Sequence, residues 1–288
     1  MAISLGGGSA SQINETIDIN SAENLITLED GRVYLKGGVT STDLTTYPDA
    51  TAAFAYTGTY FSTAAQVTAE ADIGWDGTYF WVLDRGNARV YKYNASGVYQ
   101  TVSFGVSQDN AMQGIVCVGS DFYTCGTQND KVYKYDSVGN FQSDWSVSSQ
   151  GADPTAIAYD GTYLWVLSNG NQRVYKYTTA GVYQNVNFSV AAQDVNCHGL
   201  AWDGTHFWMS GRQADTLFQY TASGVFTGFS FSVASQGTSP YGLTWDGTAL
   251  WTADDASSAS FKYQNQIGIT SLTGTNLTQG RQNYVRIK

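Results

Sequence analysis

Short runs of alternating apolar and polar residues, separated by glycine-rich turn signals, cover the middle of the chain. Between residues 72 and 104 there are four such runs, "DIGW", "YFWVL", "RVYKY" and "VYQTVSF". Alternation with a period of two is typical of half-buried strands, and Asp-Gly between the first two runs is a strong hairpin signal. No segment keeps the apolar period of about 3.6 residues that a helix needs, so the pattern predicts an all-β protein.

The four-run unit recurs along the chain. Residues equivalent to Trp75 return at steps of 42, 42, 43 and 43 residues, and the segments that follow them align without a gap. A period in the low forties with aromatic and glycine columns is the signature of a four-stranded propeller blade. The three clearest columns are Trp75, Cys117, Tyr159, Trp202 and Trp245; Gly77, Gly119, Gly161, Gly204 and Gly247; and Trp81, Tyr123, Trp165, Trp208 and Trp251.

The Asp-Gly turn leads to a prediction about its two flanking tryptophans. A two-residue type I′ turn at Asp76-Gly77 places Trp75 opposite Thr78 and puts Trp75 and Trp81 on opposite faces of the sheet. We therefore expect one tryptophan to face the preceding blade and the other to face the following blade. A wider turn changes the face assignment but keeps both residues between blades.

The number of blades depends on how the ring closes. The fifth unit ends near Gln264 after three of its four strands, and residues 52–67, "AAFAYTGTYFSTAAQV", directly precede the first unit. We predict that residues 52–67 complete the last blade and close a five-bladed β-propeller over residues 51–264. The alternative is six blades, with a separate sixth blade built from residues 28–70.

Closure of the ring brings the two remaining segments, residues 1–50 and 265–288, next to each other in space. Residues 24–39 read as a hairpin around Asp30-Gly31, and the terminal "NYVRIK" repeats the apolar–basic pattern of "RVYLK". We expect a small β-sheet made from both chain ends. Its candidate docking residues for a partner protein are Arg32, Tyr34, Tyr284 and Arg286.

Charge and composition exclude several classes of partner. The formal net charge is −10, so neutralisation of phosphates is disfavoured and nucleic acid is not expected as a partner. No apolar run approaches the length of a membrane span, so membrane insertion is not expected. The N-terminus lacks the basic start and apolar stretch of a secretion signal, which means that another export route, or none, is used, or that a leader has been removed.

Candidate catalytic chemistry is sparse. His198 has no partner in the sequence that would identify it as an acid–base catalyst, and we expect a structural role for it. The aspartates that follow the first aromatic column are expected to shape turns rather than to bind calcium, and Cys117, Cys125 and Cys197 match neither a disulfide framework nor a zinc site. The predictions are therefore no enzymatic activity, no cofactor and no metal.

The loops of the predicted propeller are the better candidates for a site. In a propeller the b–c and d–a loops share one face, and here they are variable and rich in Asn, Gln, Asp and Ser, which suits carbohydrate hydroxyls. The competing interpretation is that surface loops are simply polar. The candidate ligand-binding residues are Arg85, Asn87, Asn129, Asp130, Asn169, Asn171, Arg212, Asp215, Asp254 and Asp255.

The chain ends carry a resemblance to a known group of proteins. The start "MAISLGGGSASQINE", then "DGRVYLKGGV" and "TDLTTYPDA", and the terminal "YVRIK" resemble the ends of tail-fibre-like or appendage-like virion proteins of tailed bacteriophages. This resemblance covers about the first fifty residues and the last few. The central repeat is similar to many bacterial and phage propellers.

The resemblance implies a structural protein of the virion, on the tail or capsid surface. Its ends are expected to dock to other virion proteins, and its propeller is expected to face outward and bind a host-surface receptor or glycan. The alternatives are a purely decorative virion protein and a stand-alone extracellular propeller that acts as a lectin or an enzyme. The ends contribute no catalytic residue.

Overall fold

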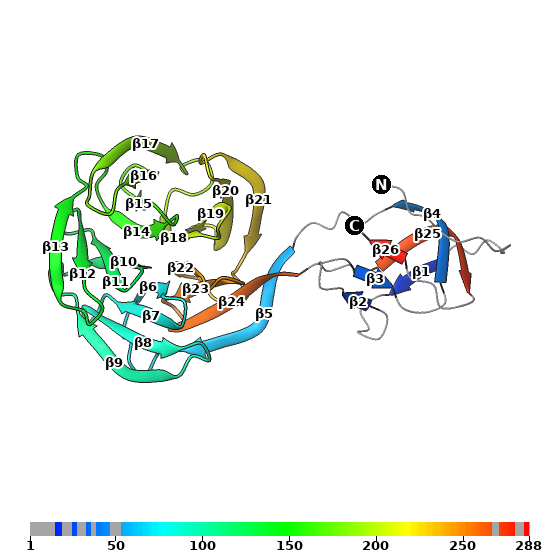
Figure 1. Ribbon diagram of the computed structural model, residues 1–288, viewed down its shortest axis with the longest axis horizontal. Helices are drawn as coiled ribbons and strands as arrows, with labels where there is room; N and C mark the ends of the chain where they lie inside the picture. Colours follow the sequence, from blue (N-terminus) through cyan, green and yellow to red (C-terminus); the bar gives the residue numbers. More distant parts are fainter. Residues whose placement is uncertain are drawn as a thin grey trace. The chain divides into compact units, whose positions relative to one another are not determined.

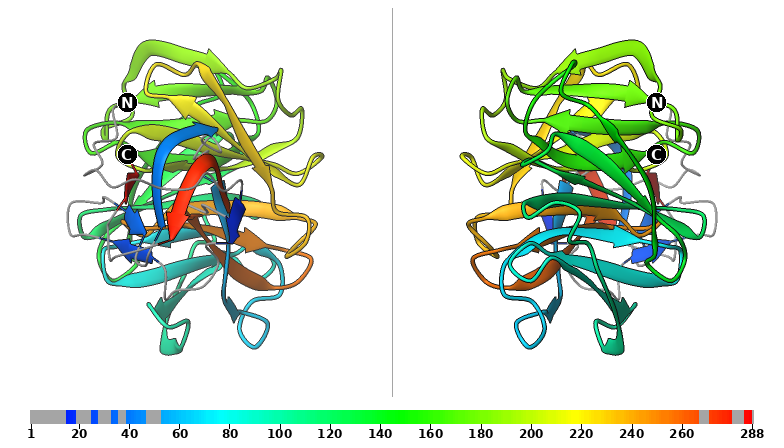
Figure 2. Two further views of the ribbon diagram at one scale, coloured as in Figure 1. Left: turned by 90° about the vertical axis from the view of Figure 1, so that its right-hand side faces the viewer. Right: turned by 90° about the vertical axis from the view of Figure 1, so that its left-hand side faces the viewer.

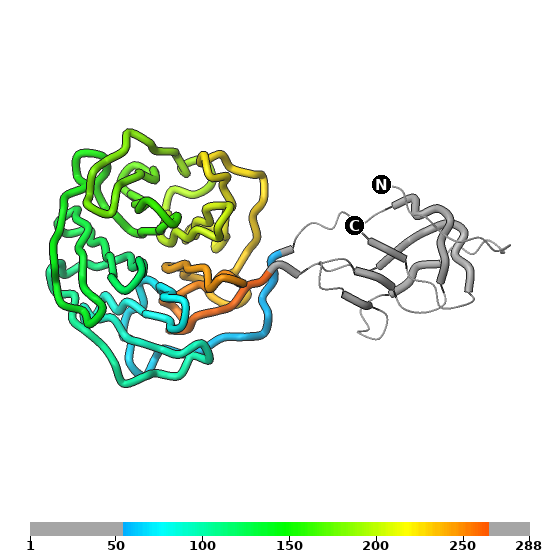
Figure 3. Tube along the Cα trace, in the orientation of Figure 1, coloured from blue at the N-terminus to red at the C-terminus, as the bar shows by residue number. Residues whose placement is uncertain are grey.

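The structure is a computed structural model, and it describes residues 53–266 together with six strands near the chain ends. Side chains are described for residues 54–264. Five antiparallel four-stranded sheets stand around a central axis, as Figure 1 shows, and the tube in Figure 3 follows the chain from one sheet to the next. The five-bladed β-propeller predicted from the repeat is confirmed, and the six-bladed alternative is wrong.

Each blade uses the strands that the repeat predicts, which we call a to d from the axis outward. Blade 1 is β6 (Glu70–Trp75), β7 (Tyr79–Asp84), β8 (Arg89–Asn94) and β9 (Tyr99–Gly105). Blade 2 is β10 (Met112–Val118), β11 (Asp121–Gly126), β12 (Lys131–Tyr135) and β13 (Phe141–Ser146). Blade 3 is β14 (Pro154–Tyr159), β15 (Leu164–Ser168), β16 (Arg173–Tyr177) and β17 (Tyr183–Ser189). Blade 4 is β18 (Cys197–Trp202), β19 (His206–Gly211), β20 (Thr216–Thr221) and β21 (Phe226–Ser232).

Blade 5 joins strands from the two ends of the repeat region. Its strands are β22 (Pro240–Trp245), β23 (Leu250–Asp254), β24 (Ala259–Gln266) and, as the outer strand, β5 (Ala53–Ser62). Figure 1 shows β5 beside β24 at the point where the ring closes. Strand d is therefore supplied to the last blade by the residues that precede the first one.

The closure is reinforced by a buried carboxyl group. Glu70 at the start of blade 1 accepts hydrogen bonds from the Thr63 hydroxyl, which follows β5, and from the Ser260 hydroxyl in β24, both at 2.9 Å. Burial raises the pKa of Glu70 to about 8, against the effect of those two hydrogen bonds and with a further contribution from Asp254 and Asp255. Glu70 thus ties the first and last parts of the ring together as a neutral acid at neutral pH.

The innermost strands of adjacent blades contact each other all the way around the ring, and Figure 2 shows the blades from the side. Asp72 in β6 accepts hydrogen bonds from the backbone N–H of Ile115 in blade 2 and of Leu243 in blade 5. At the position of Asp72 the other blades have glycine or alanine, and a side chain on Gly242 would collide with Asp72 at 2.4 Å. One buried carboxyl group therefore serves the inner edges of three blades.

The a–b hairpin differs from the predicted turn. Trp75 pairs with Phe80 rather than lying opposite Thr78, and the residues at the centre of the turn are Gly77 and Thr78. Only Gly77 has a positive φ, of 95°, as a type II′ turn requires at its first central position. The prediction of a type I′ turn with Asp76 as a central residue is wrong. Asp76 is the residue before the two central ones, and from there its side chain accepts the N–H groups of Thr78 and Tyr79.

The predicted role of the two tryptophans survives this change of turn. Trp81 packs on Phe122 of blade 2 with ring centroids 4.6 Å apart, whereas Trp75 packs on Phe80, which in turn contacts Trp251 of blade 5. The two aromatic columns therefore fill the spaces on opposite sides of each blade. Buried aromatic pairs of this kind each add about 0.5–1.5 kcal/mol beyond the area that they bury.

The chain divides into two compact units, residues 54–264 and residues 1–53 with 265–288. In the second unit, strands from both chain ends pair with each other, and Arg286 lies opposite Tyr34. Arg32, Tyr284 and the Asp30-Gly31 turn lie outside the described residues. The two three-stranded sheets are β1 (Glu15–Asp18), β25 (Ser271–Gln279) and β4 (Val39–Thr46), and β2 (Leu25–Thr27), β3 (Val33–Leu35) and β26 (Val285–Ile287).

Candidate functional site

The b–c and d–a loops lie on one face of the propeller, which we call the loop face. In every blade the residue after strand b donates its backbone N–H to a carbonyl near the end of the d–a loop, as Arg85 does to Ala69 at 3.0 Å. This repeated bond holds the two kinds of loop together. The other four donor–acceptor pairs are Thr127 and Ala111, Asn169 and Asp153, Arg212 and Asn196, and Asp255 and Ser239.

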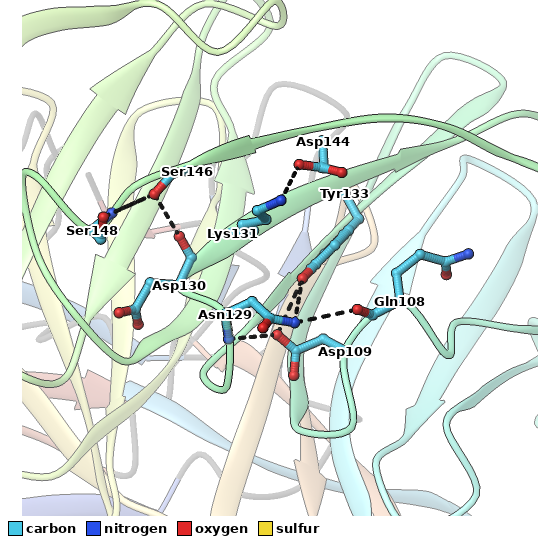
Figure 4. Close-up of polar contacts among 9 residues, drawn as sticks. All are labelled: Gln108, Asp109, Asn129, Asp130, Lys131, Tyr133, Asp144, Ser146 and Ser148. Carbon is cyan, nitrogen blue, oxygen red and sulfur yellow. Dashed lines mark hydrogen bonds and ion pairs between the residues drawn. The ribbon is translucent and has the colours of Figure 1, made fainter.

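Most amide side chains of the loop face are used within the blades. The Asn129 Nδ2 atom donates to the Gln108 carbonyl and the Tyr133 hydroxyl, and its backbone N–H donates to Asp109 (Figure 4). Asn171 repeats this arrangement in blade 3, where it donates to the Tyr175 hydroxyl at 2.7 Å. The amide-rich loops thus serve the fold, and this supports the competing interpretation of their polarity.

Glutamines of the d–a loops are tied in the same way. In all five blades a strand c tyrosine donates its hydroxyl to a glutamine 27 residues earlier, as Tyr135 does to Gln108 at 2.6 Å. The other pairs are Tyr93 and Gln66, Tyr177 and Gln150, Tyr220 and Gln193, and Tyr263 and Gln236.

Several predicted site residues have such internal roles. The buried carboxylate of Asp254 accepts the N–H groups of Ser239 and Ser257, and Asn87 donates to the buried Asp84. Asn169 accepts the backbone N–H of Cys197 from the next blade at 3.0 Å. These side chains hold loops and neighbouring blades in place, which explains their position without a ligand.

Asp130 and Asp215 occupy a position whose backbone is left-handed in every blade, with φ of 50° and 45°. Their carbonyls accept the N–H of the residue that follows strand d, Val147 and Val233 respectively. The Asp130 carboxylate also accepts the N–H of Asp153 at 2.8 Å. Asp215 differs because its buried Oδ1 atom has no hydrogen-bond partner among the described residues, and burial raises its pKa.

One group of loop-face residues has capacity left for a ligand. The Tyr241 ring in blade 5 contacts the Arg212 guanidinium of blade 4, with 3.9 Å between the guanidinium carbon and the ring centroid, and the Arg85 guanidinium of blade 1 at 4.2 Å. Arg85 also pairs with Asp255 at 2.5 Å. We call Arg85, Arg212, Tyr241, Asp255 and His198 the arginine–tyrosine cluster.

Arg212 is the less neutralised of the two arginines. Its Nη2 atom donates to the Ser239 hydroxyl at 2.9 Å, while its buried Nε atom has no partner within residues 54–264. No carboxylate of the described residues lies within 4.0 Å of its guanidinium, unlike that of Arg85. A half-buried cation whose Nε atom is buried and which has no close counter-ion is a costly arrangement that is often found at binding sites.

His198 lies against the same tyrosine. Its ring is 4.4 Å from the Tyr241 ring, and its Nε2–H donates to the Asn196 amide oxygen at 3.0 Å. Burial, together with Arg212 and Arg85, lowers the pKa of His198 to about 3, so the imidazole is neutral at neutral pH. Its buried Nδ1 atom is then an acceptor without a donor in the described part of the chain.

The sequence prediction found Arg85, Arg212 and Asp255 but missed His198 as part of a site and did not consider Tyr241. The missing signal lies in two columns at the loop-face end of the inner strands, where the residue varies from blade to blade and only arginine occurs twice in one column. A position that varies among otherwise similar repeats is not fixed by the repeat itself, although single members such as Asn169 bond to the next blade. The two columns are Ala71, Gln113, Thr155, His198 and Tyr241, and Arg85, Thr127, Asn169, Arg212 and Asp255.

The opposite end of the ring holds a cavity of about 110 Å³, lined by all five innermost strands. Cys117 lines it, and burial raises the pKa of this thiol well above its usual range, so it stays protonated. Cys117 pairs with Phe122 in the sheet rather than with Ser120, and all three cysteines are free thiols. Among the described residues no group of three His, Cys, Asp or Glu side chains is arranged to hold a metal ion, and no helix is long and apolar enough to cross a membrane.

Comparisons with known proteins bear on the fold. No family model and no curated protein sequence matches the chain. The chain is similar to the crystal structure of a glutaminyl cyclase from Myxococcus xanthus, with a TM-score of 0.59 and 10% identity over 76% of this chain and 95% of that one. It is also similar to a virginiamycin B lyase from Staphylococcus aureus, with a TM-score of 0.47 and 12% identity over 88% of this chain and 99% of that one.

The prediction that the chain has no enzymatic activity is wrong. It rests on the lack of a recognisable catalytic motif. The glutaminyl cyclase has a similar fold over most of both chains and is an enzyme. A propeller of this kind is therefore compatible with catalysis. At 10% identity the similarity shows the fold alone and transfers neither an activity nor a substrate.

Proposed function

We propose that this chain is a recognition protein whose propeller binds a surface glycan at the arginine–tyrosine cluster. The observation that carries the proposal is the convergence of Arg212, Tyr241 and Arg85 from three consecutive blades, with polar atoms that no described residue satisfies. Elsewhere on the loop face, most of the described polar side chains bond to one another, and the buried atoms without a partner are Asp215 Oδ1 and Gln113 Oε1. Binding is expected where a rigid scaffold presents polar groups that lack hydrogen-bond partners within the protein.

The surroundings of the cluster favour a hydroxyl-rich ligand over an apolar one. The exposed residues of the three b–c loops beside it are small or polar. A glycan can hydrogen-bond to such a surface, and these loops offer no large apolar side chain to an apolar ligand. The residues are Gly86, Asn87, Gln213, Ala214, Ala256 and Ser257.

We further propose that the terminal unit attaches the propeller to a larger particle, such as a bacteriophage tail or capsid. This part rests on the terminal sequence alone. Its test is removal of residues 283–288, which include β26 (Val285–Ile287). Because a short edge strand adds little to a closed propeller, the truncated chain should fold but fail to enter particles. Normal incorporation of the truncated chain would overturn this part.

The recognition proposal is tested with a glycan array. The purified chain should bind a defined subset of glycans, and the double variant Arg85→Ala/Arg212→Ala should lose that binding while keeping its thermal unfolding midpoint. The matched control is Arg173→Ala, because Arg173 begins strand c of blade 3, away from the cluster, and donates to Asn187 in strand d. Binding that survives in the double variant, or no binding to any glycan, would contradict the proposal.

Catalysis at the same cluster is the second candidate, and the shared fold with a glutaminyl cyclase favours it. Any glycan that binds should therefore be incubated with the chain and its products analysed by mass spectrometry. A general base works best with a pKa near the operating pH, so His198, with a pKa of about 3, is a weak candidate for that role. New products that disappear with the double variant would favour this second function.

A further inference from the structure

We infer that the arginine–tyrosine cluster binds the carboxylate group of an acidic sugar. The inference rests on the proposed function, since it names the class of glycan that the recognition site takes. It is carried by the kind of hydrogen-bonding capacity that the cluster leaves unused.

The unused capacity at the accessible part of the cluster consists of donors. Arg212 donates through Nη2 to Ser239, and Arg85 donates through Nη2 to Asp255. The Nη1 atoms of both guanidiniums and the Tyr241 hydroxyl make no hydrogen bond to the described residues, although Tyr241 is largely buried. Two guanidinium forks and a phenol call for an acceptor-rich partner, and a carboxylate with two oxygens fits a fork in a bidentate manner.

Two of the three carboxylates near the cluster are already committed. The Asp255 carboxylate pairs with Arg85, and the buried Asp254 accepts hydrogen bonds from Ser239 and Ser257. The pKa of Asp215, which also lies within the influence of Arg212, is raised by burial and by Asp254 and Asp194. A ligand carboxylate would therefore pair best with Arg212, whose positive charge is not neutralised by a nearby carboxylate as that of Arg85 is.

The overall charge limits the ligand to a single carboxylate at the site. With 24 acidic and 14 basic residues the chain repels polyanions, so a nucleic acid or a heavily sulfated polymer is disfavoured. Charges beyond about 8 Å are largely screened at physiological ionic strength, which means that one carboxylate is governed by the two nearby guanidiniums. A uronic acid or a sialic acid residue within an otherwise neutral glycan has this character.

His198 gives the inference a second, independent feature. About nine-tenths of this residue is buried, and its unpartnered Nδ1 acceptor lies in the ring that packs on Tyr241. A sugar acid carries hydroxyl donors beside its carboxylate, so one ligand can supply both the acceptor for the arginines and a donor for the imidazole. A chloride or sulfate ion cannot supply the donor.

The test compares each acidic glycan with its own methyl ester, which keeps the shape and the hydroxyls but removes the charge. The probes are glycans ending in glucuronate or N-acetylneuraminate, the corresponding methyl esters, and acidic peptides ending in glutamate. The acids should bind at least about 10-fold more tightly than their esters, because hydrogen bonds to a charged group are the strong ones. Arg212→Ala should remove this preference, Arg212→Lys should retain part of it, and Arg173→Ala should leave it intact.

The outcomes separate this inference from the proposed function. If esters or neutral glycans bind as tightly as the acids and the double variant loses them, the recognition site stands and the carboxylate inference is overturned. If the acidic peptides bind and no glycan does, both the sugar assignment and the proposed glycan recognition are overturned. If acids bind with equal affinity to the wild type and to Arg212→Ala, the site has been placed wrongly.

Discussion

The indole N–H of Trp251 donates a 2.7 Å hydrogen bond to Oδ2 of Asp246, five residues earlier in the same hairpin. The same bond, at the same length, joins the equivalent residues of blades 1, 3 and 4. Blade 2 has Val118 and Tyr123 at the two positions and lacks the bond. The aspartate therefore recurs because it positions the second tryptophan as well as shaping the turn, and both residues change together in the blade that dispenses with them.

Replacing Asp246 with alanine should destabilise the propeller by about 2–4 kcal/mol. The change leaves the Trp251 indole and the N–H groups of Thr248 and Ala249 without their acceptor, and unsatisfied donors are costly. Urea melts of the variant would measure this. The control Asp144→Ala removes an exposed pair with Lys131 and should cost less than about 1 kcal/mol. Equal losses would show that the hairpin carboxylate is an ordinary surface group.

Blade 2 offers a double-mutant cycle for the same interaction. Val118→Asp with Tyr123→Trp should be more stable than the sum of the two single changes by about 1–3 kcal/mol, because only the pair recreates the hydrogen bond. Denaturant midpoints of the four proteins give the coupling energy. Strict additivity would mean that the four natural pairs are not energetically linked.

The pH dependence of stability should reveal the neutral Glu70. Its folded-state pKa of about 8 lies above the unfolded value, so its stabilisation is complete at low pH and is lost as the pH rises towards 8. The slope contributed by this one group reaches about −1.4 kcal/mol per pH unit between the two pKa values. Glu70→Gln should remove that slope in melts from pH 5 to 8.5. Asp72, whose pKa burial also raises, will leave a residual slope of the same sign.

An unchanged slope in Glu70→Gln would contradict the assignment of the proton to this residue. The range above pH 5 is chosen because Asp246 acts in the opposite direction. Hydrogen bonds from Trp251 and Thr248 outweigh burial and lower its pKa, so its contribution is lost only as the medium becomes strongly acidic.

Truncation tests the closure of the ring. Deleting residues 1–50 leaves β5 intact and should leave a folded propeller. Deleting residues 1–66 removes Phe54, whose ring lies 4.7 Å from that of Trp208, and Phe61, which packs 5.6 Å from Trp251, so this chain should not fold cooperatively. Circular dichroism melts distinguish the two. Identical unfolding of both truncations and the full chain would show that β5 is dispensable.

The repeat made the propeller predictable because its aromatic and glycine columns are local features at a fixed period. The count of five followed from the place of residues 52–67 in the sequence. The turn geometry was not predictable from Asp-Gly alone, since Asp76 uses its side chain to cap the residues after Gly77. The residue types at a hairpin predict the turn class from its backbone, and they do not show that a side chain will accept the N–H groups of the turn.

The candidate site was predictable only in part, because its residues come from blades far apart in sequence. Arg85 and Arg212 stand out as charges in polar loops, but so do Asn129 and Asn171, which prove to be occupied by tyrosine hydroxyls. The contact with Tyr241 depends on the three-dimensional closure of blade 5 against blade 1. The composition of a loop does not show which of its polar side chains are already hydrogen-bonded within the fold.

Hydrogen–deuterium exchange with and without a bound glycan tests the location of the site most directly. Binding should slow exchange in the loops of blades 4, 5 and 1 that surround Tyr241, around residues 196–199, 212–215, 239–242, 85–88 and 255–258. The a–b turns, such as residues 76–79 and 160–163, should exchange as before. Protection confined to those turns, or to the loops of blades 2 and 3, would contradict recognition at the arginine–tyrosine cluster.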